Sequence, residues 1–346
     1  MLFFVGYQLC RDDRFTDTVL LFKEHIGEVY FAYGDFKNGR NISVQSDIFS
    51  PEDAVQKQER DLYILKEAGL RLNLLLNGNC YGDEALSREF FLRLGDTAEQ
   101  LKEEFGLAAV TTTSPVIAKF IKNNFTDTEV RASVNMEIGT PLAADYISEH
   151  FDSFYMKREF NRDRGRLEAM REWCDKKGKK LFGLANSGCL NFCSARTFHD
   201  NLVSHEREIS QKDNAYDFSG QCHTWLEGGD NKSIWLQVTN FIRPEEVSVY
   251  EKYFDGLKLA TRVSRSFSSI IRAYASGSYS GNLPDLLEPS HAGSFYPAVI
   301  ENKKIPVGFA EKVLGCDKNC RVCGYCKNAQ SSATVILDQE VLYAFK

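Results

Sequence analysis

Short apolar runs alternate with longer amphipathic segments along most of the chain, and this alternation limits its possible folds more than any other feature. Strand-like runs occupy residues 2–8, 28–33, 70–78, 107–113, 130–136, 152–158, 180–186, 234–241 and 256–261. Helical patterns lie between many of them, at residues 51–68, 87–105, 114–125, 141–151, 163–177 and 243–254. Strands that alternate with helices form parallel sheets, and eight strand–helix units can close into a barrel. The sequence therefore predicts an α/β fold, a (β/α)8 TIM-like barrel.

The strand-like runs are one more than an eight-stranded barrel needs. We place residues 234–241 outside the barrel, as an extended segment before the helix that Pro244 opens, so that residues 256–261 become the eighth strand. A doubly wound open sheet is the alternative. It has little support, because no GxGxxG pattern follows an early strand.

The pattern changes near Ser290, where long periodic helices stop and a cysteine-rich run follows. We therefore predict two parts: the barrel over residues 1–289, and a small metal-binding appendage over residues 290–346. The end of this second part, at residues 333–345, has the character of one or two strands.

Composition and charge narrow the functional classes. A net charge of -6 and a pI of about 5.7 argue against a nucleic-acid-binding surface, although a local basic patch is not excluded. The basic run at residues 176–180 fits the end of a helix, where cations favour the dipole. The apolar N-terminus is expected to be a buried strand and not a signal peptide, and no run reaches the length of a membrane span. We expect a cytoplasmic protein that does not enter membranes.

Four cysteines lie close together near the C-terminus: Cys316, Cys320, Cys323 and Cys326. Their spacing is C-x3-C-x2-C-x2-C, and thiolates this close repel one another unless a metal neutralises them or they form disulfides. Structural zinc usually takes two cysteine pairs a dozen or more residues apart, whereas iron–sulfur clusters accept tight runs. The run favours a [4Fe-4S] cluster, with zinc and disulfides as the alternatives.

A second group of cysteines follows the seventh predicted strand. It comprises Cys189, Cys193 and Cys222. Loops at this end of a barrel strand build active sites, so the three thiols are candidate ligands of a second cluster. Cys80 or a histidine is a candidate fourth ligand, and a zinc site or buried thiols are the alternative.

Other polar residues lie where predicted strands end. Arg158 and Asn161 follow the sixth strand and Arg262 follows the eighth, so they are candidates for binding an anionic substrate group. Glu159, together with His199 and His205 after the seventh strand, is a candidate for proton transfer. A ring of salt bridges at the barrel rim would explain the same charges.

Two stretches resemble the collagenase-like peptidase family U32. KREFN after the sixth strand is similar to an Arg-Glu-Leu-Ser type of element, and residues 241–283 resemble the family's Pro-Glu-Asp-Leu helix, Lys-Ile-x-Gly-Arg strand and Tyr-containing helix. The resemblance covers about residues 1–285. It implies a TIM-like barrel with a cysteine-bound [4Fe-4S] cluster, since several relatives are oxygen-independent hydroxylases. Cys189, Cys193 and Cys222 match the cluster ligands of those relatives.

The chain departs from this family pattern, and it therefore resembles a divergent branch. NSGCLNFC replaces the usual His-Gly-Ala-Leu-Cys and Ser-Gly-Arg-Cys elements, and KLATR lacks the glycine of Lys-Ile-x-Gly-Arg. The leading hypothesis is an iron–sulfur redox enzyme, with hydroxylation as one candidate reaction, acting on a small anionic metabolite or a macromolecule and supplied by an electron donor protein. The alternatives are a U32-type peptidase and a zinc-stabilised binding protein.

Overall fold

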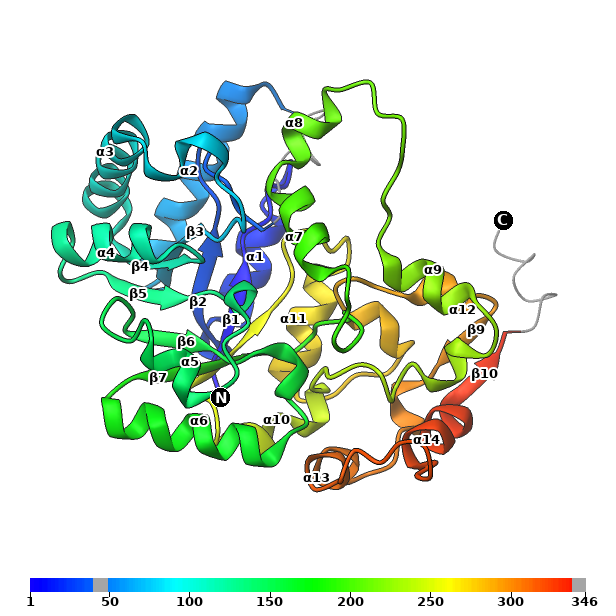
Figure 1. Cartoon of the computed structure of the whole chain (residues 1–346). Helices are drawn as coiled ribbons and strands as arrows, with labels where there is room; N and C mark the ends of the chain where they lie inside the picture. Colours follow the sequence, from blue (N-terminus) through cyan, green and yellow to red (C-terminus); the bar gives the residue numbers. More distant parts are fainter. Residues whose placement is uncertain (40–48, 338–346) are drawn as a thin grey trace.

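Eight parallel strands close into a barrel in the order of the chain (Figure 1). The structure, a computed structural model, describes residues 1–39 and 49–337. The strands are β1 (Phe3–Gly6), β2 (Ile26–Phe31), β3 (Arg71–Leu76), β4 (Leu107–Thr112), β5 (Glu129–Ala132), β6 (Ser153–Tyr155), β7 (Lys180–Leu184) and β8 (Gly256–Leu259). β1 also pairs with β8, with Phe3 opposite Leu257, so the sheet has no open edge. The predicted TIM barrel is confirmed, and the open sheet is excluded.

Helices surround the barrel, and polar residues fix where several of them begin. The helices include α1 (Arg14–Leu21), α2 (Pro51–Glu67), α3 (Arg88–Phe105), α4 (Pro115–Asn124), α5 (Pro141–Asp145), α6 (Arg164–Lys177) and α11 (Phe267–Ser276). The hydroxyls of Ser50, Ser87 and Ser114 accept hydrogen bonds from backbone N–H groups of the first turn, which caps α2, α3 and α4. α6 ends at Gly178, which has a left-handed φ of 63°, so the basic run belongs to a helix end.

The sequence prediction was wrong in several details. Residues 234–241 lie outside the barrel as expected, but they continue a 3₁₀ turn (Asn231–Ile234) as further turns and a bend instead of an extended strand. Their apolar character has another cause, because Trp235, Leu236 and Phe241 are fully buried in the core. β5 and β6 are shorter than predicted, and helix α1 was not predicted.

The interior of the barrel is filled by two kinds of side chain. An aromatic and aliphatic cluster occupies the part nearer the carboxyl ends of the strands and includes Phe4, Tyr30, Tyr155 and Phe182. Below it lies a buried polar layer centred on Arg131, whose guanidinium donates to both carboxylate oxygens of Glu28 at 2.7 and 3.0 Å. This interior is therefore packed, and a site has room at the carboxyl ends of the strands.

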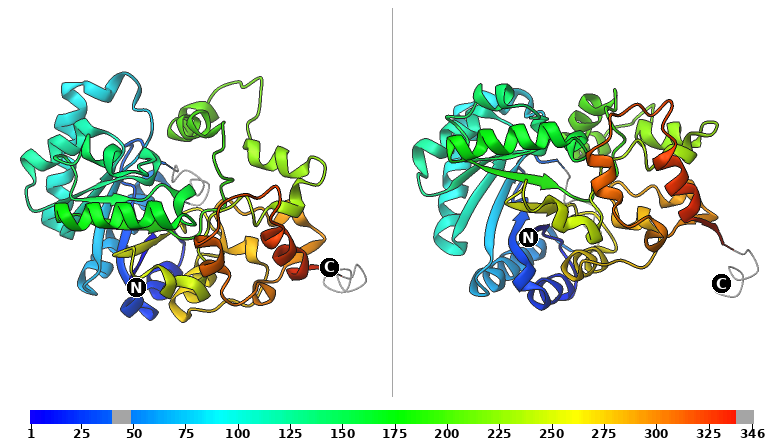
Figure 2. Two further views of the ribbon diagram at one scale, coloured as in Figure 1. Left: turned by 60° about the horizontal axis from the view of Figure 1, so that its bottom comes forward. Right: turned by 90° about the horizontal axis from the view of Figure 1, so that it is seen from below.

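The chain after the barrel packs beside it (Figure 2). It contains α12 (Ala292–Phe295), β9 (Ala298–Ile300), α13 (Phe309–Leu314), α14 (Tyr325–Ala333) and β10 (Thr334–Ile336). β9 and β10 form an antiparallel pair, so one strand of the predicted C-terminal pattern is present, while residues 338–346 lie outside the described part. The boundary at residue 290 stays a prediction. No described helix combines the length and the apolar composition that crossing a bilayer requires.

Candidate functional site

A cavity of about 100 Å³ opens at the carboxyl ends of the barrel strands. Three cationic side chains reach it from different elements: Arg158 from the loop after β6, Lys258 from β8 and Arg262 from the loop after β8. Cys189, Asp200 and Glu288 line the same cavity. Because a water molecule occupies about 30 Å³ in the liquid, the space suits a group of carboxylate or sulfate size.

Lys258 is the most unusual of these residues. Its side chain is buried within the barrel mouth, 8% exposed, and its Nζ lies 4.0 Å from the centroid of the Tyr30 ring. Burial, reinforced by the charge of Arg262, lowers the pKa of Lys258 to about 7. A lysine in this state changes charge near neutral pH, as catalytic and anion-binding lysines do. Lys258 was not among the residues predicted from the sequence. Its position could have revealed it, because it interrupts the apolar strand GLKLAT and points into the barrel.

The two arginines are held in different ways. Arg158 donates to Asn135 Oδ1 at 3.0 Å and lies 3.5 Å from Cys189 Sγ, while its Nε has no hydrogen-bond partner among the described residues. Arg262 donates to Asn38 Oδ1 at 2.9 Å and packs against Gly6, where a Cβ would lie 2.4 Å from the Arg262 Cγ. Both predicted anion-binding arginines therefore line one cavity. Their function in binding stays a prediction.

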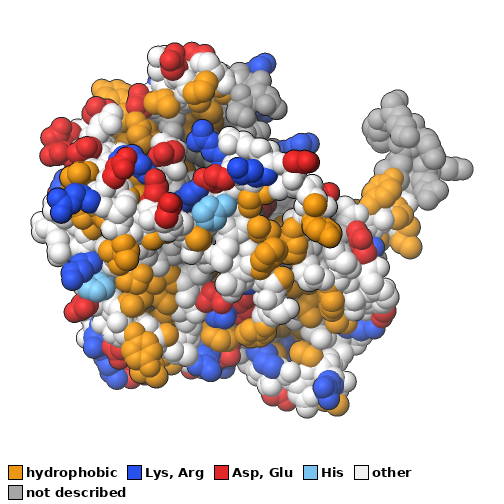
Figure 3. Space-filling model, turned by 45° about the horizontal axis from the view of Figure 1, so that its top comes forward, with side chains coloured by type: hydrophobic (Ala, Val, Ile, Leu, Met, Phe, Trp, Pro, Cys, Tyr) orange, Lys and Arg blue, Asp and Glu red, His pale blue; other side chains and the backbone are white. Residues whose placement is uncertain are grey.

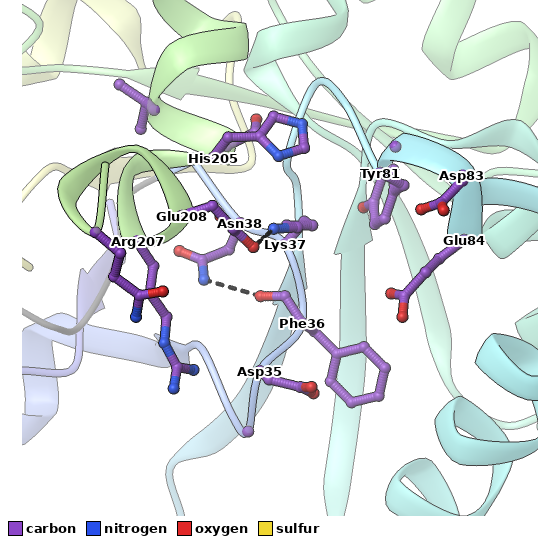
Figure 4. Close-up of a pocket in the computed structure, with 15 residues that line it drawn as sticks. Asp35, Phe36, Lys37, Asn38, Tyr81, Asp83, Glu84, His205, Arg207 and Glu208 are labelled. Atoms are coloured by element: carbon purple, nitrogen blue, oxygen red, sulfur yellow. Dashed lines mark hydrogen bonds and ion pairs between the residues drawn. The ribbon is translucent and has the colours of Figure 1, made fainter. Parts of the chain in front are cut away.

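A larger cavity of about 520 Å³ lies beside the barrel mouth (Figure 4). Val203 lines both cavities, and Asn38, which accepts the hydrogen bond from Arg262, lines the larger one. His205, at the end of helix α7 (Arg196–Ser204), lines this outer cavity, opposite Tyr81. His205 is thus separated from the inner cations, and its predicted function as a proton carrier concerns the outer cavity.

Glu159 and Asn161 lie away from the barrel-mouth cavity. The carboxylate of Glu159 is buried and lies 2.7 Å from Arg196 Nη2. Asn161 is fully buried, and its amide donates to the carbonyl oxygens of Leu184 and Asn240, which anchors the loop after β6. The structure thus gives both residues clear structural contacts, and their predicted catalytic and substrate-binding functions stay predictions.

The cysteines after β7 lie near histidines from other segments. Cys222 begins helix α9 (Gln221–Glu227), and a Cβ on Gly220 would lie within 3.8 Å of both Cys222 Sγ and the His199 ring. Burial, reinforced by the nearby thiols of Cys189 and Cys193, raises the pKa of Cys222. Among the described residues, Cys222, His223 and His291 are a set whose potential ligand atoms all lie within 4.8 Å of one another. Sequence reasoning did not find His291, since it lies 103 residues from Gly188, whose carbonyl it contacts. Cys80 precedes Tyr81 of the outer cavity, and its function as a ligand stays a prediction.

Three of the four C-terminal cysteines (Cys316, Cys320 and Cys323) lie in the loop between α13 and α14, and Cys326 lies in the first turn of α14. Cys320 and Cys323 are exposed, and Cys316 and Cys326 are half-buried. Burial, reinforced by the neighbouring thiols of Cys316 and Cys323, raises the pKa of Cys320. Lys318 fixes the loop from a left-handed conformation (φ 61°), since its amine donates to the carbonyls of Arg162 and Val313.

A third cavity, of about 370 Å³, lies between this loop and the barrel. Cys316, Cys320 and Cys326 line it on one side, and Glu159 and Arg162 line it on the other. Glu159 therefore lines this third cavity and not the barrel-mouth cavity, which Arg158 beside it in sequence lines.

The surface near the barrel mouth carries charges of both signs. Figure 3 shows acidic and basic side chains intermingled on this face. Lys37 and Glu208 at the outer cavity, for example, form an ion pair. No basic field that would suit a nucleic-acid backbone is visible on the drawn face of the described residues.

Comparisons with known proteins reveal similarity at the level of fold. A solved U32 peptidase, Mk0906, superimposes with a TM-score of 0.53 and 17% sequence identity, over 75% of this chain and 91% of that one. The chain has a U32-like fold. A GH113 β-1,4-mannanase (TM-score 0.40, 12% identity, 80% of this chain and 99% of that one) and an L-ribulose 3-epimerase (0.36, 12%, 61% and 83%) are more distant. No sequence-family model and no curated protein matches the chain. The U32 resemblance therefore holds for the fold.

Proposed function

We propose that the protein is an iron–sulfur redox enzyme that acts on an anionic group held at the barrel mouth. The reaction class is oxygen-independent hydroxylation or a related modification. The observation that carries the proposal is the convergence of Lys258, Arg158 and Arg262 on one small cavity at the carboxyl ends of the strands. This is the end at which TIM-barrel enzymes build their active sites.

The charges in the cavity support an anionic substrate group. Three cations face the carboxylates of Asp200 and Glu288, so the balance is positive when Lys258 is protonated. The Nε of Arg158 is a buried donor without a partner among the described residues, and a ligand oxygen would satisfy it. The remainder of a small metabolite, or of a macromolecule, would extend into the outer cavity of about 520 Å³.

The C-terminal cysteines support the cofactor. Three thiols in the loop between α13 and α14 and a fourth at the start of α14 form a complete donor set, and Lys318 holds that loop against the barrel. These thiols are separate from the compact set of potential ligands formed by Cys222, His223 and His291. A tight run of four thiols suits a cubane better than a single zinc ion, because structural zinc usually takes two cysteine pairs that lie far apart in sequence. Cys316, Cys320, Cys323 and Cys326 would hold a [4Fe-4S] cluster, which supplies one-electron transfer when bound.

An electron donor protein would meet the loop from outside. Cys320 and Cys323 are exposed, and Val322 between them is 81% exposed. A short apolar contact beside a redox centre is typical of the small, transient interfaces of electron-transfer partners.

Metal analysis tests the cofactor. Protein purified without oxygen should contain roughly four iron atoms and four sulfides per chain for each cluster and should show an EPR signal after reduction. The C320S variant should lose most of this iron, whereas C10A, which changes a buried cysteine beside β1, should retain it. A colourless wild-type protein that holds only zinc would contradict the proposal and support the zinc-stabilised binding protein.

Sulfate binding tests the barrel mouth, because the charge of sulfate does not change between pH 6 and 9. Lys258 is protonated below its pKa of about 7 and neutral above it. The other groups that act on Lys258 or line its cavity are Arg262, Glu28, Arg131, Arg158, Tyr30, Cys189, Asp200 and Glu288. Burial raises the pKa of Tyr30 to about 12, so Tyr30 stays neutral in this range. Sulfate affinity measured by calorimetry should therefore fall about tenfold from pH 6 to pH 8 in the wild type.

The K258M variant should bind sulfate weakly and with little dependence on pH, and R262M should bind it more weakly at every pH. K119M changes an exposed lysine on α4 and serves as the control. Equal sulfate affinity in wild type, K258M and R262M would contradict anion binding at this cavity without affecting the cofactor test.

The U32-like fold keeps a peptidase as the second candidate. A cysteine nucleophile would have to be free of metal and activated by a neighbouring charge or base. Arg158 beside Cys189 offers such a charge. Peptide hydrolysis that persists in iron-free protein and disappears in C189S would favour this candidate over the redox enzyme.

A further inference from the structure

We propose that Cys222, His223 and His291 bind a single zinc-type ion beside the barrel mouth. Their potential ligand atoms lie within 4.8 Å of one another, and one thiolate with two imidazoles is a donor set that suits zinc. The inference goes beyond the proposed function, because it concerns neither the C-terminal cysteines nor the anion-binding cavity. It also assigns Cys222 to an ion rather than to a cluster with Cys189 and Cys193.

His291 is oriented as a metal ligand would be. The side chain is fully buried, and its Nε2 lies 2.9 Å from the carbonyl oxygen of Gly188. A carbonyl oxygen can only accept, so Nε2 carries the proton and Nδ1 has a lone pair. Nδ1 is buried and has no hydrogen-bond partner among the described residues. Metal-binding histidines commonly donate their other ring N–H to a backbone carbonyl in this way, which fixes the tautomer and the ring orientation.

The backbone around His291 depends on close packing at Gly188. A Cβ at this position would lie 2.0 Å from the carbonyl oxygen of Pro289, so a side chain has no room there. The N–H of Gly188 also donates to the carbonyl of Glu288 at 2.9 Å. These contacts hold the segment that carries His291 against the loop after β7, and α12 behind it packs on α9.

The other two ligands come from the start of α9. Gly220 has a φ of 101°, a conformation that other residues rarely adopt, and it turns the chain into the helix just before Cys222 and His223. Both side chains are half-buried, so an ion can enter from solvent. The ring of His223 lies 5.0 Å from the ring of His291, measured between centroids. Ligand atoms around tetrahedral zinc lie roughly 3.5 Å apart, so small side-chain rotations would complete the site.

Cobalt binding to the full-length chain tests the site. The C-terminal thiols are removed as competitors in a C316S/C320S/C323S/C326S background, and Co²⁺ is titrated without oxygen while visible absorption is recorded. We expect one Co²⁺ per chain with a sulfur-to-metal absorption band. The band should disappear in C222S, and affinity should fall at least about tenfold in H223A and H291Q.

H291Q is informative because a glutamine amide can replace the Nε2–H that donates to Gly188 but provides no nitrogen lone pair at Nδ1. H25Q changes an exposed histidine at the start of β2 and should bind Co²⁺ as the background does. Unchanged affinity in both H223A and H291Q, with loss of binding in C189S or C193S, would overturn the proposal in favour of a thiolate cluster.

If the background variant does not fold, X-ray absorption spectroscopy of zinc bound to the wild-type chain tests the site instead. A metal shell that contains nitrogen, and that loses it in H223A/H291Q, supports the site. A shell of sulfur alone in the wild type overturns it. Iron and sulfide content decides the proposed function separately, so the two proposals can fail independently.

Discussion

Replacing Lys258 with methionine should stabilise the protein at pH 6 by about 4–5 kcal/mol. The pKa of Lys258 is lowered to about 7 in the folded chain, because burial disfavours its charged form. In the unfolded chain a lysine titrates near 10.4, and one pKa unit corresponds to about 1.4 kcal/mol. Between these two values the unfolded chain binds more protons, so wild-type stability should rise with pH from about 7 to 10. Below pH 7 the full cost of burying the charge is present.

Urea unfolding of wild type and K258M at several pH values checks this result. The advantage of K258M should shrink toward pH 10, where the lysine is neutral in the folded state and increasingly so in the unfolded one. K119M should follow the wild type throughout, because this side chain is exposed. A destabilised K258M at pH 6 would show that Lys258 contributes to the fold, and would remove the argument that it is retained for function.

Replacing Arg131 with methionine should destabilise the protein by about 3–5 kcal/mol, since the change leaves a buried carboxylate without its partner. Arg131 and Glu28 have side chains that are 1% exposed, and the guanidinium also donates to Glu129 at 2.8 Å. Burial alone would raise the pKa of Glu129, but the charge of Arg131 and hydrogen bonds from Ser153 outweigh it and hold that pKa well below its usual range. Methionine keeps much of the volume that packs on Phe182.

The double variant R131M/E28L separates two explanations. If the loss in R131M comes from the orphaned carboxylate of Glu28, removing both charges should recover most of it, leaving a deficit below about 2 kcal/mol. If the double variant is as unstable as R131M, the loss comes from packing or from two other hydrogen bonds, which Asn73 donates to Glu28 and Arg131 donates to Glu129. K102M breaks an exposed ion pair with Asp127 and should change the stability little.

The fold could be predicted from the sequence because barrel strands and helices carry strong, regular patterns. Ser50, Ser87 and Ser114 mark helix starts, and each one caps the helix expected there. Residues 234–241 misled the prediction because burial, and not strand formation, makes them apolar. A short apolar run indicates that its residues are buried, but it does not indicate which elements they pack against.

The site could be predicted only in part, since it depends on residues that meet through folding. Arg158 and Arg262 follow strand ends, and barrel topology brings strand ends together. Lys258 could have been found from the alternation of β8, in which Leu257 and Leu259 point outward and Lys258 inward. His291 could not, because only the packing of Pro289 on Gly188 brings it to Cys222 and His223. Glu159 and Arg158 share a 3₁₀ turn (Arg158–Phe160) but line different cavities, which the sequence did not indicate.

The packed interior of the barrel also limits the directions from which a molecule can approach Lys258. Phe4, Tyr155 and Phe182 fill the barrel interior near its mouth, and the Arg131 layer packs beneath them. Val203 lines both the small cavity and the outer cavity, so the two cavities meet at this residue. A ligand bound in the outer cavity beside Val203 would therefore obstruct exchange between the two cavities.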